Sequence, residues 1–125
     1  MKYDVRFTKA AEDNLTDIFD YICNVLKSSK EAHKLITQIE AKVNSLDYMP
    51  ERHQRIMEEP WFSSGFRMVT VKNYIIAYVI DHKGKVVYVF AVFYNGRDYR
   101  STLNKYMNEE NIKNEMLKSE TNEAK

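Results

Sequence analysis

Apolar and polar positions alternate at the start of the chain and then change to a helical period. The alternation runs from Tyr3 to Phe7 and predicts a first β-strand with one face toward solvent. Thr8 is a suitable N-cap for a helix that we expect to continue to about Lys27. The apolar stripe of this helix follows steps of three and four residues, at Ala11, Leu15, Ile18, Ile22 and Leu26.

A second helix is predicted directly after the first. Ser28 and Glu31 have the Ser-x-x-Glu spacing of a capping box, in which each residue satisfies backbone N–H groups of the first helical turn. Because the connection is short, the two helices are expected to form an antiparallel hairpin. The apolar residues that share one face of the second helix are Ala32, Leu35, Ile36, Ile39, Val43 and Leu46.

The segment from Asp47 to Ser64 has no steady period and is predicted to be a loop that lies against the sheet. Pro50 stops the preceding helix, since a proline in a helix interior removes a hydrogen bond and clashes with the preceding turn. Trp61 and Phe62 are expected to anchor the loop, because aromatic pairs in loops more often pack into a core than stand exposed for recognition.

Three further strands are predicted, at Phe66 to Val71, Tyr74 to Asp81 and Val86 to Tyr94. The breaks between them are short, one at Lys72-Asn73 and one around Gly84, and both contain residues that tolerate a left-handed backbone. Short breaks of this kind predict an antiparallel meander. The fold class is therefore α+β: an N-terminal strand, a two-helix hairpin, a three-stranded antiparallel meander and a C-terminal helical segment.

The last two strands are apolar on both faces, which is typical of strands inside a covered sheet. Strict alternation in the last strand places Val86, Tyr88, Phe90 and Val92 on one face and Val87, Val89, Ala91 and Phe93 on the other. The helical hairpin can cover only one of the two faces. The C-terminal segment, a partner chain or an exposed apolar patch must account for the other.

The length and composition are those of one compact domain, with 125 residues of which 44% are hydrophobic. We place the domain at residues 1–107 and a polar extension at residues 108–125. A weak helical pattern runs from Tyr99 to Leu117, and the chain after it is expected to be frayed.

Several kinds of protein are disfavoured by the sequence. Cys23 is the single cysteine, so no internal disulfide can form. No apolar run approaches the roughly 18 residues of a membrane span, and the first residues lack a secretory pattern, so we expect a cytoplasmic protein with no membrane partner. The three histidines are scattered and the three glycines are isolated, which predicts neither a metal site nor a nucleotide cofactor.

Charge is distributed unevenly along the chain, although the formal net charge is only +1. Residues 51–106 carry 9 basic and 5 acidic side chains, while the flanking segments are slightly acidic. This bias is compatible with an anionic partner, but it is far below that of a dedicated nucleic-acid binder. Ordinary solvated surfaces explain it equally well.

The chemistry that remains is a set of basic and aromatic residues in and after the meander. Arginine presents a planar fork of donors that suits phosphate and carboxylate alike. A purely structural alternative stays open: Arg97 and Asp98 would cap the strand-to-helix junction, and Arg67 would pair with an acid on a neighbouring strand. The candidate binding residues are Arg52, Arg55, Arg67, Tyr94, Arg97, Asp98 and Arg100.

The order and spacing of these elements resemble the RelE/ParE superfamily of bacterial type II toxin–antitoxin toxins. The resemblance covers residues 3–103, and no single piece of it is specific alone. Its pieces are Tyr3-Asp4-Val5-Arg6-Phe7-Thr8, then Ala11, Leu15, Ile18, Tyr21 and Ile22, then Leu46 and Pro50, Gly65-Phe66-Arg67, Asn73-Tyr74 with Tyr78, and Gly96-Arg97-Asp98 with Leu103.

The resemblance implies a small protein that arrests growth when it is free and that a cognate antitoxin neutralises. In such pairs a segment of the antitoxin wraps the toxin as helix and extended chain, forming a hetero-oligomer. That wrapping would supply the missing cover for an apolar sheet face.

The RelE-like branch of the superfamily cleaves mRNA on the ribosome, using clustered basic residues and often a C-terminal tyrosine or histidine for proton transfer. Arg67 and Arg97 match basic positions of that pattern, and with Tyr94 they would be the catalytic candidates. Other matching positions hold Val69, Ile75 and Leu103, which are apolar. The substitutes Tyr94, Tyr99, His53 and Tyr106 stand elsewhere.

The ParE-like branch is associated with poisoning of DNA gyrase, for which protein contacts replace catalysis. The long first helices and the ending from Tyr94 to Leu103 are closer to this branch. We therefore favour a ParE-like toxin that acts on DNA gyrase and is not an enzyme. The alternatives are a ribosome-dependent mRNA endoribonuclease and a non-toxic relative that shares only the fold.

Overall fold

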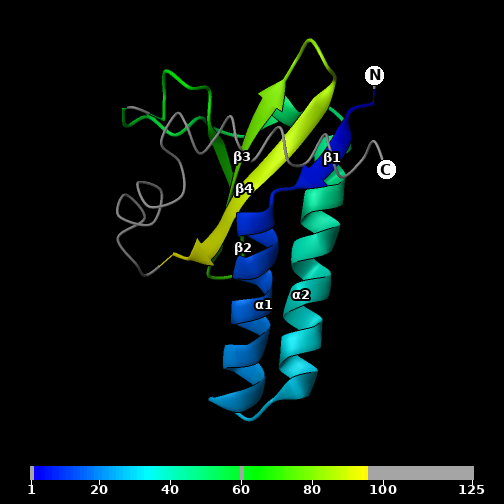
Figure 1. Cartoon of the computed structure of the whole chain (residues 1–125), viewed down its shortest axis with the longest axis vertical. Coiled ribbons are helices and arrows are strands. Elements are labelled where there is room, and N and C mark those ends of the chain that lie inside the picture. Colours follow the sequence, from blue (N-terminus) through cyan, green and yellow to red (C-terminus); the bar gives the residue numbers. More distant parts are fainter. Residues whose placement is uncertain (1, 60, 96–125) are drawn as a thin grey trace.

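The computed structural model describes residues 2–59 and 61–95, which form an α+β fold in two layers (Figure 1). The helical pattern predicted after Tyr94 and the proposed boundary at residues 107–108 lie outside the described residues. The elements, in chain order, are β1 (Asp4–Phe7), α1 (Lys9–Asn24), α2 (Ser29–Asn44), the short 3-10 helices Ser45–Asp47 and Pro50–Arg52, β2 (Arg67–Val71), β3 (Tyr74–Asp81) and β4 (Val86–Tyr94).

The four strands form one sheet in the order β1-β4-β3-β2. The predicted meander is confirmed, since β2 pairs antiparallel with β3 and β3 pairs antiparallel with β4. The first strand lies beside β4 and runs parallel to it. A parallel pair requires a crossover connection, and the α1–α2 hairpin is part of that connection.

Both predicted helix starts are confirmed by their caps. The Thr8 hydroxyl accepts a hydrogen bond from the backbone N–H of Ala11 at 3.2 Å and donates one to the carbonyl of Val89 at 3.1 Å. Thr8 therefore fastens the start of α1 to β4. At the start of α2, the Ser28 hydroxyl accepts from the backbone N–H of Glu31 at 3.3 Å. Each cap satisfies a donor that the helix itself leaves unpaired.

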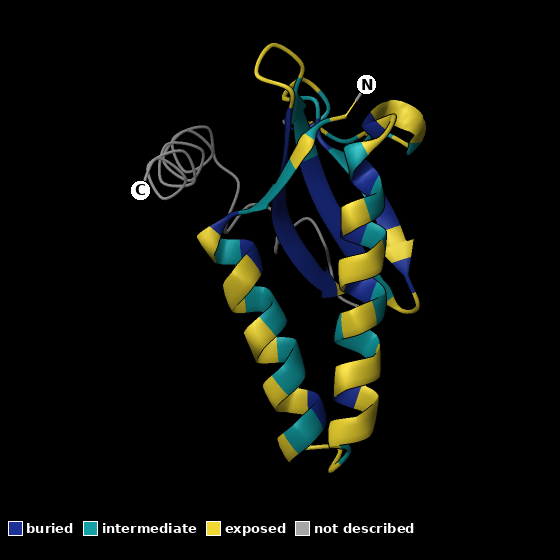
Figure 2. Ribbon diagram, turned by 90° about the vertical axis from the view of Figure 1, so that its right-hand side faces the viewer, coloured by how far each residue is buried: buried dark blue, intermediate teal, exposed yellow. Residues whose placement is uncertain are grey.

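The two helices cover one face of the sheet (Figure 2). Ile39 and Val43 of α2 pack there against Ile76 and Tyr78 of β3 and Val87 of β4, all fully buried. These residues form the part of the core that lies between the helical hairpin and the sheet.

The opposite face of the sheet is covered in part by the loop between α2 and β2. Ile56 and Trp61 of this loop belong to one buried cluster with Phe66 and with Phe90 of β4. The rings of Phe66 and Phe90 meet edge to face, with centroids 5.4 Å apart. The prediction that Trp61 anchors the loop on the sheet is thus confirmed, and the loop supplies cover that the hairpin does not.

The strict alternation predicted for the last strand is wrong beyond Phe90. Ala77 pairs with Ala91, whereas the next residue of β3, Tyr78, pairs with Val89, which leaves Phe90 as an extra residue on β4. Such a β-bulge reverses the side-chain alternation after it. As a result Ala91 lies with Phe90 in the cluster away from the helices, as does Phe93, and Val92 joins Val87 and Val89 in the cluster beneath them.

The apolar stripe of α1 is also only partly buried. Ala11 and Ile22 are buried, but Leu26 is 58% exposed and Tyr21 is 54% exposed. The helix ends at Asn24, earlier than predicted, and Lys27 adopts a left-handed backbone with φ of 57° in the turn to α2. The reason for the exposure is visible in Figure 1, where the hairpin extends past the end of the sheet.

Among residues 2–59 and 61–95, no helix combines the length and the apolar character needed to cross a membrane.

Candidate functional site

The basic residues of the loop between α2 and β2 lie along the outer edge of the sheet. The loop pairs with β2 through two backbone hydrogen bonds, from Ile56 N to Phe66 O at 2.8 Å and from Met68 N to Gln54 O at 3.0 Å. This pairing holds Arg55 opposite Arg67. The edge of β2 is therefore covered by the chain's own loop, and the cationic candidates are brought to one region.

Arg67 fastens this loop to the sheet. Its guanidinium donates to the carbonyl oxygens of Glu51 at 3.0 Å and of His53 at 2.7 Å. Tyr78 is paired with Arg67 on the neighbouring strand β3. Its hydroxyl donates a hydrogen bond to the carbonyl of Pro50 at 2.6 Å. The structural alternative in which Arg67 pairs with an acid on a neighbouring strand is wrong, because in the described part of the chain its hydrogen-bond partners are backbone carbonyls of the loop.

Arg52 performs a similar task at the end of α2. Its guanidinium donates to the carbonyl of Ser45 at 3.2 Å, to the Ser45 hydroxyl at 3.1 Å and to the carbonyl of Met49 at 3.2 Å, and it also contacts the carbonyl of Tyr48. Carbonyls at a helix C-terminus lack intrahelical partners, and a cation there also opposes the helix dipole. Arg52 thus closes the helix end onto the following turns.

Arg55 completes the set from within the loop. It donates to the carbonyl of Phe62, and its guanidinium carbon lies 4.0 Å from the centroid of the Phe62 ring. Stacking of an arginine on an aromatic ring is a cation–π contact. We call Arg52, Arg55 and Arg67, with the carbonyls they bind, the arginine brace.

His53 lies within the arginine brace and has a shifted pKa. Burial lowers the pKa of His53 below its usual value of 6.5, and the positive charges of Arg52, Lys42 and Arg67 lower it further. The imidazole is therefore neutral at pH 7. Its ring meets that of Tyr78 nearly at right angles, with centroids 6.4 Å apart, and within the described part of the chain its buried Nε2 atom has no hydrogen-bond partner.

Tyr78 is the second titratable group in this region. Burial raises the pKa of Tyr78 to about 12, against smaller opposing effects from Arg67 and Arg52. The hydroxyl therefore keeps its proton at neutral pH and remains the donor to Pro50. Sequence reasoning used Tyr78 only as a part of the family pattern, since a tyrosine on a central strand carries no signal of a carbonyl partner 28 positions earlier.

Tyr94 lies at the other end of the sheet. It pairs with Tyr74 of β3, and their rings meet edge to face with centroids 5.7 Å apart. Arg67 pairs with Tyr78, so the two candidates are separated by four residues along β3 and by two strand spacings. At about 3.4 Å per residue and about 4.8 Å per strand, their backbones are roughly 17 Å apart.

The remaining sequence candidates cannot be placed. Arg97, Asp98 and Arg100 lie outside the described residues, so the structure neither joins them to the arginine brace nor separates them from it. Within the described ranges, no group of three or more histidine, cysteine, aspartate or glutamate side chains is arranged to hold a metal ion.

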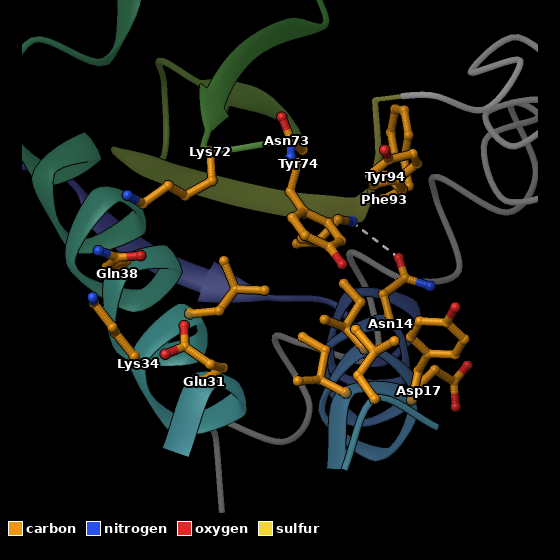
Figure 3. A pocket seen from close by; sticks show the side chains of 16 residues that line it. Asn14, Asp17, Glu31, Lys34, Gln38, Lys72, Asn73, Tyr74, Phe93 and Tyr94 are labelled. Carbon is orange, nitrogen blue, oxygen red and sulfur yellow. Dashed lines mark hydrogen bonds between the residues drawn. The ribbon is translucent and has the colours of Figure 1, made fainter. Parts of the chain in front are cut away.

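A feature that the sequence analysis missed is a groove of about 1070 Å³ between the two helices and the end of the sheet (Figure 3). We call it the hairpin groove. The side-chain oxygen of Asn14 accepts a hydrogen bond from the backbone N–H of Val92 at 3.0 Å. The residues that line it are Asn14, Asp17, Ile18, Tyr21, Ile22, Leu26, Glu31, Lys34, Leu35, Gln38, Lys72, Asn73, Tyr74, Val92, Phe93 and Tyr94.

Comparison with known proteins agrees with this geometry. The family model of the ParE toxin of the type II toxin–antitoxin system, parDE, matches residues 5–99. The chain belongs to the ParE toxin family. This confirms the resemblance to the RelE/ParE superfamily and its closer likeness to the ParE branch. No curated protein sequence matches the chain significantly.

Solved structures show the same fold. The chromosomal ParDE toxin–antitoxin system from P. aeruginosa has a TM-score of 0.63 at 21% identity, covering 74% of this chain and 96% of that one. An arginine double mutant of E. coli toxin RelE in the free state has a TM-score of 0.59 at 14% identity, covering 86% and 100%. A RelBE toxin–antitoxin complex from Mycobacterium tuberculosis has a TM-score of 0.55 at 19% identity, covering 78% and 95%.

Proposed function

We propose that this ParE family member poisons DNA gyrase through protein contacts, arrests growth when free, and is held inactive by a cognate antitoxin. The family match supports a toxin of this type. The observation that carries the choice of target is the arginine brace, in which all three guanidinium groups bind carbonyls of their own chain. Their main task in the structure is to hold a loop.

An endoribonuclease needs a proton acceptor, a proton donor and a group that stabilises the charge on phosphate, all within reach of one bond. Arg67 and Tyr94 are separated by roughly 17 Å at about 3.4 Å per residue along a strand and about 4.8 Å between strands. Because the Arg67 guanidinium is also held on the carbonyls of Glu51 and His53, this separation disfavours joint action on one phosphate. A mechanism based on binding needs no such convergence, which favours gyrase as the target.

The test is made on purified gyrase and in cells. Addition of the chain to gyrase should abolish supercoiling and cause cleaved DNA to accumulate, and induction in cells should raise DNA breaks while translation at first continues. Unchanged supercoiling at a saturating concentration of the chain would exclude this target. Harmless induction without an antitoxin would instead support a non-toxic relative that shares only the fold.

The ribonuclease stays a second candidate because of one observation, the neutral imidazole of His53 beside Arg52 and Arg67. A neutral histidine next to cations is suited to accept a proton while the cations hold an anion. On programmed ribosomes this candidate predicts mRNA cleavage that His53→Gln removes. His33→Gln, an exposed histidine on α2, is the matched control and should leave cleavage intact.

The antitoxin belongs to the same proposal. Two of the similar solved structures are described as a ParDE toxin–antitoxin system and a RelBE toxin–antitoxin complex, which supports a protein partner of that kind here. We expect the chain to be purified as a stable hetero-oligomer when it is co-expressed with a short protein encoded beside it. Growth arrest by the chain alone, and growth with both proteins, is the expected result.

A further inference from the structure

The turn that follows α2 carries two large apolar side chains at the surface. Tyr48 is 57% exposed and Met49 is 51% exposed. They lie between the 3-10 helices Ser45–Asp47 and Pro50–Arg52, at the end of α2 remote from the tip of the hairpin (Figure 1). We call residues 45–52 the apolar turn.

The backbone of the apolar turn is fixed by donors from several directions. Arg52 binds three of its carbonyls, and Arg67 binds another. The backbone N–H of Tyr3 and the hydroxyl of Tyr78 each bind one more. The carbonyls held in this way are those of Ser45, Asp47, Tyr48, Met49, Pro50 and Glu51.

Met49 has a backbone conformation that few residues with a side chain adopt. Its φ is 46° and its ψ is 57°, which lie in the left-handed region. The other non-glycine residues with positive φ in the described ranges are lysines in the turns that join helices or strands: Lys27, Lys72 and Lys85. Strain of this kind persists only where the surrounding structure imposes it, and it is concentrated at functional sites. At Met49 the strain accompanies an exposed apolar side chain.

Exposed apolar side chains on a fixed backbone are suited to anchor a protein interface. Tyrosine offers a large apolar ring with a polar tip, and methionine adapts its shape to a pocket. Because the backbone beneath them is already ordered, binding costs little further conformational entropy. The arginine brace therefore does more than hold the loop, since Arg52 and Arg67 also order the surface that carries Tyr48 and Met49.

The charges beside the apolar turn define the chemistry of a partner. The guanidinium of Arg52 is hydrogen-bonded to uncharged oxygens, which leaves its positive charge uncompensated. Lys42 lies in the last turn of α2, and in the described part of the chain neither cation has an ion pair. Asp47 is paired with Lys2 at 3.9 Å, so Glu51 is the acid that opposes the two cations. A complementary surface is apolar at its centre and carries carboxylates at its rim.

We propose that the apolar turn anchors the chain on its target protein, with Tyr48 and Met49 entering an apolar pocket that has carboxylates at its rim. The identification of that protein as gyrase rests on the proposed function. The exposed side chains, the fixed backbone and the charges of the apolar turn do not depend on it.

The first test separates binding from folding at Met49. Glycine adopts positive φ without strain, so Met49→Gly relieves the backbone and removes the anchor. The Tm should fall by no more than about 3 °C. The concentration of the chain that inhibits supercoiling by purified gyrase should rise about tenfold or more. Met57→Ala, a methionine that is 69% exposed outside the apolar turn, is the control and should inhibit as the wild type does.

Two results at Met49 would overturn the proposal. One is inhibition by Met49→Gly at the wild-type concentration. The other is a fall in Tm beyond about 3 °C, which would show that the methionine side chain stabilises the fold rather than standing ready for a partner.

Tyr48 is tested by a pair of variants in the same assay. Tyr48→Ala removes the ring and should weaken inhibition about tenfold, whereas Tyr48→Phe keeps the contact area and should lose no more than about threefold. Val25→Ala is the control, because Val25 is 59% exposed at the far end of the hairpin. Inhibition by Tyr48→Ala equal to that of the wild type would exclude the ring as an anchor.

The acidic rim is tested through Lys42. Direct binding of the full chain to gyrase is measured by interferometry at about 50 mM and about 300 mM salt. Lys42→Gln should weaken binding about threefold at low salt, and the difference should shrink at high salt because salt screens exposed charges. Lys30→Gln, at the opposite end of the same helix, should bind as the wild type does. No effect of Lys42→Gln at low salt would contradict a pocket with carboxylates at its rim.

Growth arrest separates this inference from the proposed target. If the wild type arrests growth without affecting gyrase, and Met49→Gly at an equal level does not arrest growth, the target fails and the anchor stands. If both chains inhibit gyrase equally, the anchor fails and the target stands.

Two other occupants of the apolar turn have outcomes of their own. A dimer in sedimentation that Tyr48→Ala dissociates would assign the apolar turn to a second copy of the chain. Loss of co-purification with a short protein encoded beside the chain, while Tyr48→Ala still inhibits gyrase, would assign it to the antitoxin. Either result would overturn the proposal.

Discussion

The arginine brace and the hairpin groove lie in different parts of the molecule and differ in what their charged groups contact. In the arginine brace, Arg52, Arg55 and Arg67 bind carbonyls of their own chain. In the hairpin groove, Asp17 and Lys34 have no ion-pair partner among the described residues. Residue type alone pointed to the first region, whereas unused binding capacity points to the second.

This contrast follows from what each region must do for the fold. The loop of the arginine brace has little regular structure, so its backbone carbonyls need donors from side chains. Arginine supplies several donors from one rigid group and can reach two carbonyls at once. The helices of the hairpin already satisfy most of their own backbone groups, so they need few side-chain donors for that purpose.

The largest effect is expected from Arg67→Ala. It removes the donor to Glu51 and His53, and the loop loses its fixed position on β2, so the free energy of unfolding should fall by about 2 kcal/mol. Urea unfolding followed by circular dichroism measures this change. A loss below about 0.5 kcal/mol would show that Arg67 is free for a ligand and would remove the distinction between the two regions.

A smaller effect is expected from Tyr78→Phe, which deletes the hydroxyl that donates to Pro50 at 2.6 Å. The buried carbonyl loses its donor, and stability should fall by about 1 kcal/mol. Tyr21→Phe, at an exposed position on α1, is the control and should change little. Because Tyr78 and Arg67 hold the same loop, the double variant should lose less than the sum of the two single losses.

Much of the fold was predictable because local patterns determine it. Thr8 and Ser28 cap the helices as their types and spacing predict, and the period of two identifies the strands of the meander. The bulge at Phe90 was not predictable, since it depends on how β4 registers with β3 rather than on the composition of either strand. The residues of β4 from Val89 to Phe93 are all apolar, so the reversal of faces leaves no trace in the sequence.

The candidate site was less predictable for two physical reasons. The partners of Arg67 and Arg52 are backbone carbonyls, which every residue carries and which therefore give no sequence signal. The hairpin groove exists because the hairpin extends past the sheet, so that Leu26, which follows the end of α1, continues the apolar stripe without a surface to pack on. Whether Leu26 is covered depends on how long the hairpin is relative to the sheet, and the period of the apolar stripe does not contain that information.

His53, inside the arginine brace, should make the stability of the chain depend on pH. Burial, and then the charges of Arg52, Lys42 and Arg67, lower the pKa of His53 in the folded chain below the unfolded value of 6.5. The unfolded chain therefore binds more protons at acidic pH, so this contribution to stability is complete above about pH 6.5 and is lost as the pH falls through the folded-state pKa. His53→Gln should remove that loss.

The measurement is the difference in unfolding free energy between wild type and His53→Gln from about pH 8 to about pH 5. The difference should change in favour of the variant as the solution is acidified. His33→Gln is the control, because that residue is exposed on α2 and should leave the pH dependence as it is in the wild type. A constant difference for His53→Gln would show that its imidazole is not held neutral by the arginine brace.

The smallest effect is expected in the hairpin groove, and it tests the comparison most directly. Asp17→Asn and Lys34→Gln remove charges that make no ion pair among the described residues, so each should change the unfolding free energy by less than about 0.5 kcal/mol. A loss of stability above about 1 kcal/mol would mean that these charges already serve the fold, as the arginines do. The hairpin groove would then lose its claim to be the open binding surface.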